Sequence, residues 1–285
     1  MSPQLPIGVF DSGLGGLTVV RALKARLPNE SIVYLGDAAR VPYGTRSEAT
    51  VLRYARGCAQ VLIERGVKLL VVACNTASAV ALEELRESLD VPVVGVIEPG
   101  AKAAVGAAHR LQHAGTRGVR IGVLGTLSTV ASGAYPRAVR QLCPELAVEV
   151  QSAPLFVPLV EEGWLEGEIP RLVVERYLES LLRHEVQVIV LGCTHYPLLK
   201  PMITQVAARL SPAPIAVVDG AEATALEVEG LLRQRQLSAA QRQAGGLQLL
   251  VTDLPRHFEL SVARFLGSKA PNAELVDIAV AAASS

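Results

Sequence analysis

The sequence has no excess of charge of either sign. Lys plus Arg and Asp plus Glu each number 27 among 285 residues, so the formal net charge is zero. We therefore expect no nucleic-acid partner bound through a general basic field. No uninterrupted apolar run approaches the roughly 20 residues of a membrane span. The start of the chain, Met1 to Gly8, lacks the basic and long apolar regions of a signal peptide. These absences predict a cytoplasmic protein with no membrane partner.

Cysteine is also scarce, and four residues are too few for a disulfide framework. There is no C-x-x-C pair, whereas structural zinc needs four ligands that often come in close pairs. No lysine stands in a setting distinctive of a Schiff base with pyridoxal phosphate. The turn that starts at Asp11 reads D-S-G-L-G-G-L-T, and Thr18 breaks the dinucleotide pattern G-x-G-x-x-G. We therefore predict no metal and no cofactor.

Half of the residues are hydrophobic, and strand-like runs alternate with helix-like ones. Helical spacing is clearest over 48–65, where apolar residues recur at intervals of three and four. Continuous apolar strands between amphipathic helices are typical of a parallel sheet covered on both faces. The first strands are expected at 7–10, 31–35, 68–73 and 91–97, and the first helices at 17–27, 48–65 and 78–89.

The pattern then starts again. Ile7-Gly-Val returns as Ile121-Gly-Val, Val41-Pro42 returns as Val157-Pro158, and Cys74 returns as Cys193. The order and the nearly constant spacing predict an α/β fold of two similar three-layer αβα lobes with mostly parallel sheets. We expect pseudo-two-fold symmetry, with the active site between the lobes. The segment after residue 210 is too short for a third domain. The expected lobes are therefore 1–97 plus 211–285, and 98–210. The small, polar residues 279–285 are expected to fray.

The two matched cysteines end apolar runs, in L-V-V-A-C-N-T and L-G-C-T-H-Y-P. Ligands of open α/β sheets bind at the carboxyl ends of strands. If a helix begins after each cysteine, its N–H groups can bind carboxylates and favour a thiolate. A single cysteine there is more often a small buried apolar residue. A matched pair followed by polar residues favours function. Cys58, on a helical apolar face, and Cys143, before a proline, are interpreted as structural.

The other candidates each have a simpler alternative. The glycine-rich turn from Asp11 is either an anion site or a plain turn with Asp11 or Ser12 as helix cap. Tyr43 either binds a ligand or belongs to a surface turn. Glu161 and Glu162 fit solvated charges, and His195 either tunes the nearby thiol or fills the core.

Two like thiols suit one reaction in particular. Inverting a carbon centre by proton transfer needs one group to remove a proton and another to return one from the opposite face. The two groups exchange roles in the reverse direction, so they should be chemically alike. A cysteine hydrolase with His195 as base would leave one of the two cysteines idle.

Five stretches together resemble the cofactor-independent glutamate racemases: F-D-S-G-L-G-G-L-T-V, V-P-Y-G, A-C-N-T-A-S, F-V-P-L-V-E and G-C-T-H-Y-P-L, over residues 7 to 267. The resemblance implies an isomerase that interconverts L- and D-glutamate and supplies D-glutamate for peptidoglycan synthesis. It also implies a homodimer. An aspartate racemase remains an alternative, as does a two-lobe amino-acid binding protein.

The resemblance also implies roles for individual residues. Cys74 and Cys193 would be the acid/base pair. Asp11, Glu161 and His195 would assist them, although a shift of one residue would exchange Glu161 for Glu162. Contacts with the substrate would come from eight residues: Asp11, Ser12, Tyr43, Gly44, Asn75, Thr76, Thr194 and His195.

Overall fold

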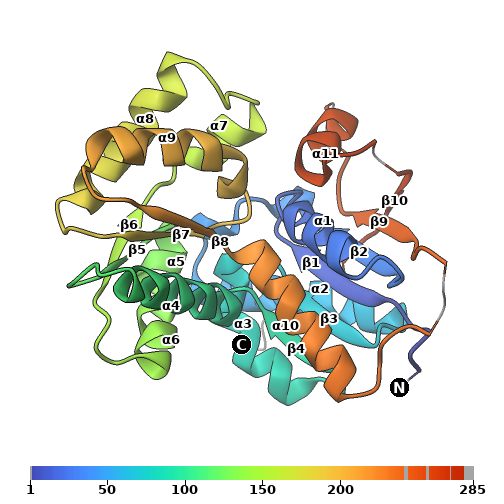
Figure 1. Cartoon of the computed structure of the whole chain (residues 1–285). Helices are drawn as coiled ribbons and strands as arrows, with labels where there is room; N and C mark the ends of the chain where they lie inside the picture. Colours follow the sequence, from blue (N-terminus) through green and yellow to red (C-terminus); the bar gives the residue numbers. More distant parts are fainter. Residues whose placement is uncertain (1, 241–242, 255–256, 270, 279–285) are drawn as a thin grey trace. The chain divides into compact units, whose positions relative to one another are not determined.

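The computed structural model describes residues 2–240, 243–254, 257–269 and 271–278. The tail 279–285, which we expected to fray, lies outside these ranges. The chain forms two compact units, Met1–Val96 with Thr224–Ser285 and Ile97–Ala223 (Figure 1). Each is an α/β unit built on its own parallel sheet, as the sequence predicted.

The first unit holds a six-stranded sheet in the order β10-β9-β2-β1-β3-β4, and every pair in it is parallel. The residues of β1 and β3 are fully apolar or small apart from Asp11 and are buried throughout, as in a sheet covered on both faces. The strands are β1 (Ile7–Asp11), β2 (Ile32–Gly36), β3 (Leu69–Val72), β4 (Val93–Gly95), β9 (Leu247–Val251) and β10 (Ala273–Leu275).

Helices cover both faces of this sheet (Figure 1). One core cluster joins α2 and α3 to the sheet residues Phe10, Leu35 and Val72. Apolar residues of α2 at intervals of three and four face this cluster, as the spacing predicted. Four of them are buried and two are partly buried, in the order Val51, Ala55, Cys58, Leu62, then Tyr54 and Val61. Helix α1 packs against β2 and α11. The helical segments are α1 (Leu17–Arg26), η1 (Ala38–Arg40), η2 (Tyr43–Thr45), α2 (Glu48–Glu64), α3 (Asn75–Ser88) and α11 (Phe258–Leu266).

The second unit holds a four-stranded parallel sheet in the order β6-β5-β7-β8. Helices α4 and α6 lie on one face and α8 and α9 on the other (Figure 1). Its strands are β5 (Ile121–Gly125), β6 (Val148–Ser152), β7 (Val188–Gly192) and β8 (Ala216–Asp219). Its helices are α4 (Ile97–His113), α5 (Leu127–Ala131), α6 (Ala134–Leu142), α7 (Phe156–Glu161), α8 (Glu168–Leu182), η3 (Tyr196–Leu199) and α9 (Lys200–Leu210).

The two sheets share one strand order. The arrangement β2-β1-β3-β4 of the first corresponds to β6-β5-β7-β8 of the second, and the first adds β9 and β10 beside β2. Ile7 and Ile121 begin corresponding strands, and Cys74 and Cys193 follow corresponding strands. The V-P match does not correspond in local structure. Val41-Pro42 connects η1 to η2, whereas Val157-Pro158 lies inside α7.

The boundary after the second sheet differs from the one that the sequence suggested. We expected residues from 211 onward to return to the first lobe. Instead β8 pairs with β7, with Val188 opposite Ala216, and so completes the second sheet. The division falls after Ala223, inside α10 (Gly220–Gln234). Strand β8 occupies the position beside β7 that β4 occupies beside β3, so the repeat is one strand longer than expected.

A buried ion pair joins the amino-terminal ends of β2 and β3. Lys68 is fully buried, and its Nζ lies 2.5 Å from Oε2 of Glu30, which is 4% exposed. Lys68 also donates to the carbonyl of Pro3 at 2.6 Å, and the Ala239 amide donates to Oε1 of Glu30 at 2.7 Å. The pair thus connects both chain segments of the first unit.

Removing one partner of this pair should destabilise the protein strongly. In Glu30→Gln the Lys68 charge stays buried without a carboxylate, at an expected cost of about 3–5 kcal/mol in the free energy of unfolding. The measurement is urea unfolding at neutral pH. Glu30→Gln with Lys68→Met leaves no buried charge, so this double variant should recover most of the loss. An unchanged urea midpoint in Glu30→Gln would contradict the expectation.

Candidate active site

Cys74 stands between the end of β3 and the start of α3. It is the N-cap of this helix, and its Sγ accepts the Ala77 amide at 3.5 Å. The thiol also points to Oγ of Ser12 at 3.6 Å and is 5% exposed. An N–H group and a helix amino terminus both favour negative charge on sulfur. The position therefore suits a thiol that alternates between its neutral and ionised forms.

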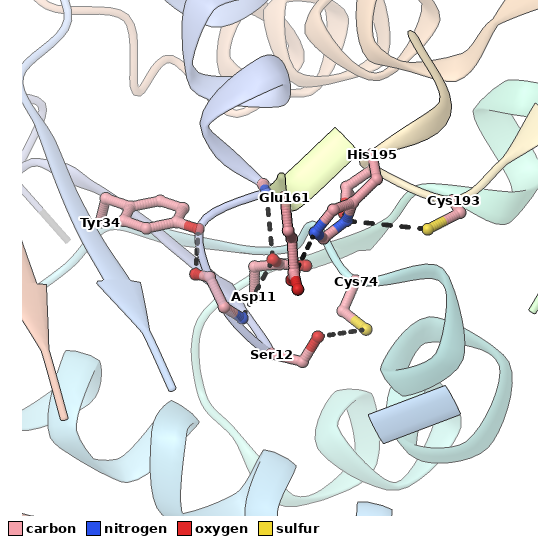
Figure 2. Close-up of polar contacts among 10 residues, drawn as sticks. Asp11, Ser12, Tyr34, Cys74, Glu161, Cys193 and His195 are labelled. Carbon is pink, nitrogen blue, oxygen red and sulfur yellow. Dashed lines mark hydrogen bonds and ion pairs between the residues drawn. The ribbon is translucent and has the colours of Figure 1, made fainter. Parts of the chain in front are cut away.

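The turn after β1 is held by Asp11, which is fully buried. Its Oδ2 accepts the amides of Gly13 at 3.2 Å and Gly16 at 3.0 Å. Two of the N–H groups that we considered as an anion site thus bind the protein's own carboxylate. The alternative of a helix cap also fails, because the N-cap of α1 is Gly16 and it has no side-chain hydrogen bond. The hydroxyl of buried Tyr34 donates to the Gly13 carbonyl at 2.7 Å (Figure 2).

Cys193 directly follows β7, but no α-helix begins after it, contrary to our expectation. Ser78 donates its amide to the Cys74 carbonyl at 2.8 Å, which starts α3. The corresponding donor after Cys193 would be residue 197, a proline, which has no N–H group. Tyr196 donates to the Cys193 carbonyl instead, at 3.2 Å, and the 3₁₀ helix η3 follows. Cys193 therefore lacks the helix-capping geometry of Cys74.

The Cys193 thiol has an imidazole as its polar neighbour instead of a helix terminus. His195 is 4% exposed, and its Nδ1 lies 3.9 Å from Sγ of Cys193. Its Nε2 lies 3.2 Å from Oε1 of Glu161 (Figure 2). Burial lowers the pKa of His195, but its hydrogen bonds to Cys193 and Glu161 and their charges outweigh burial and raise that pKa to about 10. His195 is therefore protonated at neutral pH.

The geometry distinguishes Glu161 from its neighbour. Glu161 is the last residue of α7, and its carboxylate reaches His195. Glu162 follows the helix and closes it, with its amide donating to the Pro158 carbonyl at 2.9 Å. The contact with His195 favours Glu161 as the assisting carboxylate.

The remaining predicted residues lie near these two cysteines within their own units. Asn75 and Thr76 begin α3 and are buried. Thr194 is buried beside His195, with its Oγ1 3.4 Å from Nδ1. Tyr43 is 1% exposed, and its hydroxyl donates to Oδ2 of Asp37 at 2.6 Å. This side chain therefore points into the protein, so a ligand contact at Tyr43 would involve its backbone.

Two polar residues near Cys74 were missed at the sequence level. Asp37 directly follows β2, and Cys74 lies just beyond β3. The place of Asp37 at the carboxyl end of a strand is a signal by which it could have been found. Tyr34 lies inside β2, where nothing local distinguishes it from a core aromatic residue. No group of three His, Cys, Asp or Glu residues suited to a metal ion occurs in the part of the chain that the structure describes. Within the same residues no helix is long and apolar enough to cross a membrane.

Two thiols after equivalent strands, each beside its own polar groups, are what an isomerase that moves protons requires. Residues 17–228 match the family of Asp/Glu/hydantoin racemases. A glutamate racemase of Geobacter metallireducens is 47% identical over 267 residues, which cover 94% of each chain. This chain belongs to that racemase family, and the resemblance seen in the sequence is confirmed.

Solved structures agree over nearly the whole chain. The glutamate racemase of Thermus thermophilus, in complex with β-chloro-D-alanine, is 44% identical with a TM-score of 0.83, over 97% of this chain and 98% of that one. The glutamate racemase of Francisella tularensis, in complex with D-glutamate, is 34% identical with a TM-score of 0.87, over 96% and 98%. The predicted fold class is confirmed.

The charge on His195 should depend on Glu161. Glu161→Gln removes one of the two groups that raise the pKa of His195, so this pKa should fall from about 10 towards 6.5. A raised histidine pKa stabilises the fold fully below pH 6.5, and this stabilisation is lost as pH rises through about 10. Wild type and variant should therefore differ most in stability near pH 6.5, where the wild-type stabilisation is still complete. The pKa is measured by NMR titration of the imidazole.

Glu162→Gln is the matched control, because it removes a neighbouring charge from the residue that closes α7. It should leave the titration of His195 unchanged. Equal shifts in the two variants would mean that the ion pair with Glu161 does not control this imidazole.

Proposed function

We propose that this protein interconverts L- and D-glutamate without a cofactor, with Cys74 and Cys193 as the two acid/base groups. The observation that carries the proposal is the position of the cysteines. They follow β3 and β7, which occupy the same place in two sheets of the same strand order. The relatives named as glutamate racemases support the choice of substrate.

In the proposed reaction, the thiolate of one cysteine takes the α-proton from one face of the substrate and becomes a thiol. The electron pair of the broken C–H bond stays on the α-carbon. The thiol of the other cysteine then gives a proton to the opposite face and becomes a thiolate, so the two residues have exchanged protonation states. The reverse reaction uses the same groups in exchanged roles.

The two thiols have different support. Cys74 has the Ala77 amide, the start of α3 and the hydroxyl of Ser12. Cys193 has His195, whose positive charge Glu161 stabilises. Protonated His195 can stabilise the Cys193 thiolate or return a proton to it. The charge that develops beside the substrate carboxylate requires fixed dipoles in place of a cofactor. Asn75, Thr76 and Thr194 are the polar side chains next to the thiols.

The wider role follows from the same proposal. Such an enzyme would supply D-glutamate for peptidoglycan synthesis, act in the cytoplasm and need no nucleic-acid or membrane partner. The homodimer and the roles of Asp11, Ser12, Tyr43 and Gly44 in substrate contact are part of the proposal. So is the assignment of the active site to residues of both lobes.

Each cysteine should be indispensable for racemisation. Cys74→Ala and Cys193→Ala should each lower turnover by about 10²–10⁴-fold, because each removes one of two acid/base groups. Circular dichroism with each glutamate enantiomer measures this loss. In D₂O, NMR should show residual α-proton exchange of one enantiomer in one variant and of the other enantiomer in the other.

Cys143→Ala is the control. Cys143 is a partly exposed cysteine of the second unit whose thiol donates to Glu145 at 3.3 Å, and its loss should leave racemisation unchanged. Wild-type rates in either active-site variant would rule out the two-base assignment.

The purified protein should need no additive. After dialysis against a chelator, it should racemise L-glutamate at an unchanged rate, and hydroxylamine should not inhibit it. Loss of activity that a metal or pyridoxal phosphate restores would contradict a cofactor-free mechanism. L-Aspartate should react more slowly under the same conditions. Faster racemisation of aspartate would favour the aspartate racemase alternative, and binding without racemisation would favour the amino-acid binding protein.

A further inference from the structure

We propose that Asp37 is a positioning residue, which acts through Tyr43 to hold the short turn η2 (Tyr43–Thr45) in the geometry that binds substrate. The inference rests on the proposed function, in which Tyr43 and Gly44 contact glutamate. It assigns a task to a buried charge that the proton-transfer mechanism does not use.

Both oxygens of the Asp37 carboxylate are engaged. The Tyr43 hydroxyl donates to Oδ2 at 2.6 Å. Oδ1 accepts from Nη1 of Arg40 and from Oγ1 of Thr252, each at 2.9 Å. Asp37 itself is fully buried. Hydrogen bonds to an ionised acceptor are roughly twice as strong as neutral ones, so this carboxylate is a rigid anchor.

The partners of Asp37 are themselves tied to the surrounding backbone. Thr252 follows β9, its amide donates to the Gly36 carbonyl at 3.1 Å, and its Oγ1 accepts the Ala39 amide at 2.9 Å. Arg40 donates to the Ile278 carbonyl at 3.1 Å. The anchor for η2 is therefore built from the ends of β2 and β9 and from the segment after β10.

The hydroxyl of Tyr43 belongs to this anchor. Burial, with the charges of Cys58 and Asp37, raises the pKa of Tyr43 far above its usual range, so the hydroxyl keeps the proton that it donates. The centroid of the Tyr43 ring lies 5.5 Å from the centroid of the Tyr54 ring. Gly44 has no side chain, so it can meet a substrate only through its backbone. The position of the η2 backbone, which Tyr43 connects to Asp37, therefore decides the quality of that contact.

The same segment lies beside the turn that carries Ser12. A methyl group added at Gly13 would stand 3.3 Å from Cγ2 of Val41, so the Val41 side chain lies against Gly13. Gly13 in turn is held by Asp11 and Tyr34. A displacement of the segment from Val41 to Thr45 would thus also displace the turn that carries Ser12, the partner of Cys74.

The test compares substrate binding with turnover in two variants. Tyr43→Phe removes only the hydroxyl, and Asp37→Asn removes the charge while keeping the side chain's shape. Each should raise KM for glutamate about tenfold while kcat changes less than about threefold, because η2 binds the substrate and does not move its proton. Calorimetric titration with D-glutamate should show a matching rise in Kd. Thr252→Val keeps the Asp37 carboxylate and its bond to Arg40. It should also raise KM and Kd, but by less.

The double variant Asp37→Asn with Tyr43→Phe tests whether the two residues act together. If Asp37 acts through Tyr43, the effects on KM should be far from multiplicative, and the double variant should resemble Asp37→Asn alone. Effects on KM that simply multiply would overturn the inference.

Two controls separate positioning from stability. Ile32→Val trims the core at the other end of β2, and Glu30→Gln breaks the buried pair with Lys68. Both should lower Tm and leave KM unchanged. If Tyr43→Phe and Asp37→Asn lower Tm but leave KM and Kd unchanged, Asp37 only stabilises the fold and the inference is wrong. A wild-type protein that neither binds nor racemises glutamate would overturn the proposed function and this inference with it.

Discussion

The parallel pairing of β1 with β3 is the constraint on which the surroundings of Cys74 depend. Phe10 lies opposite Val72, and the Ala73 amide donates to the Phe10 carbonyl at 2.9 Å. Both strands therefore end at the same edge of the sheet, where Ser12 and Cys74 come within 3.6 Å although 62 residues separate them. An antiparallel pairing would place their ends at opposite edges. The chemistry at Cys74 thus follows from the direction of two buried strands.

The second unit repeats this strand order but not its local consequences. Strand β7 pairs with β5 as β3 pairs with β1. Pro197 then prevents the hydrogen bond that would start an α-helix at Cys193, and the chain enters η3. His195, supported by Glu161 from α7, supplies the charge that a helix terminus supplies at Cys74. Two chemically alike thiols are therefore surrounded by different groups, one mainly backbone dipoles and the other a titratable ion pair.

Buried carboxylates near Cys74 fix the backbone. Asp11 accepts the amides of Gly13 and Gly16, and Asp37 accepts Tyr43, Arg40 and Thr252. A buried ionised group is costly unless hydrogen bonds satisfy it, and each of these carboxylates has several donors. Because most of these donors come from the turns after β1 and β2, the same hydrogen bonds satisfy the charges and shape the turns. The turns after β1 and β2 are thereby held in place by buried carboxylates.

The two α/β units, their repeated strands and the cysteine turns could be predicted from the sequence, because periodicity and turn residues are local properties of the chain. The other features depend on contacts between segments that are far apart in the chain. Strand β8 belongs to the second sheet because it pairs with the edge of β7. The residues of β8 alone do not indicate which sheet they join. The Tyr43 side chain points inward, where its hydroxyl donates to Asp37 directly after β2. Glu161 and Glu162 are the same residue type and adjacent, so the sequence does not distinguish them. Consecutive helical positions point about 100° apart, and the packing of α7 directs the Glu161 carboxylate to His195.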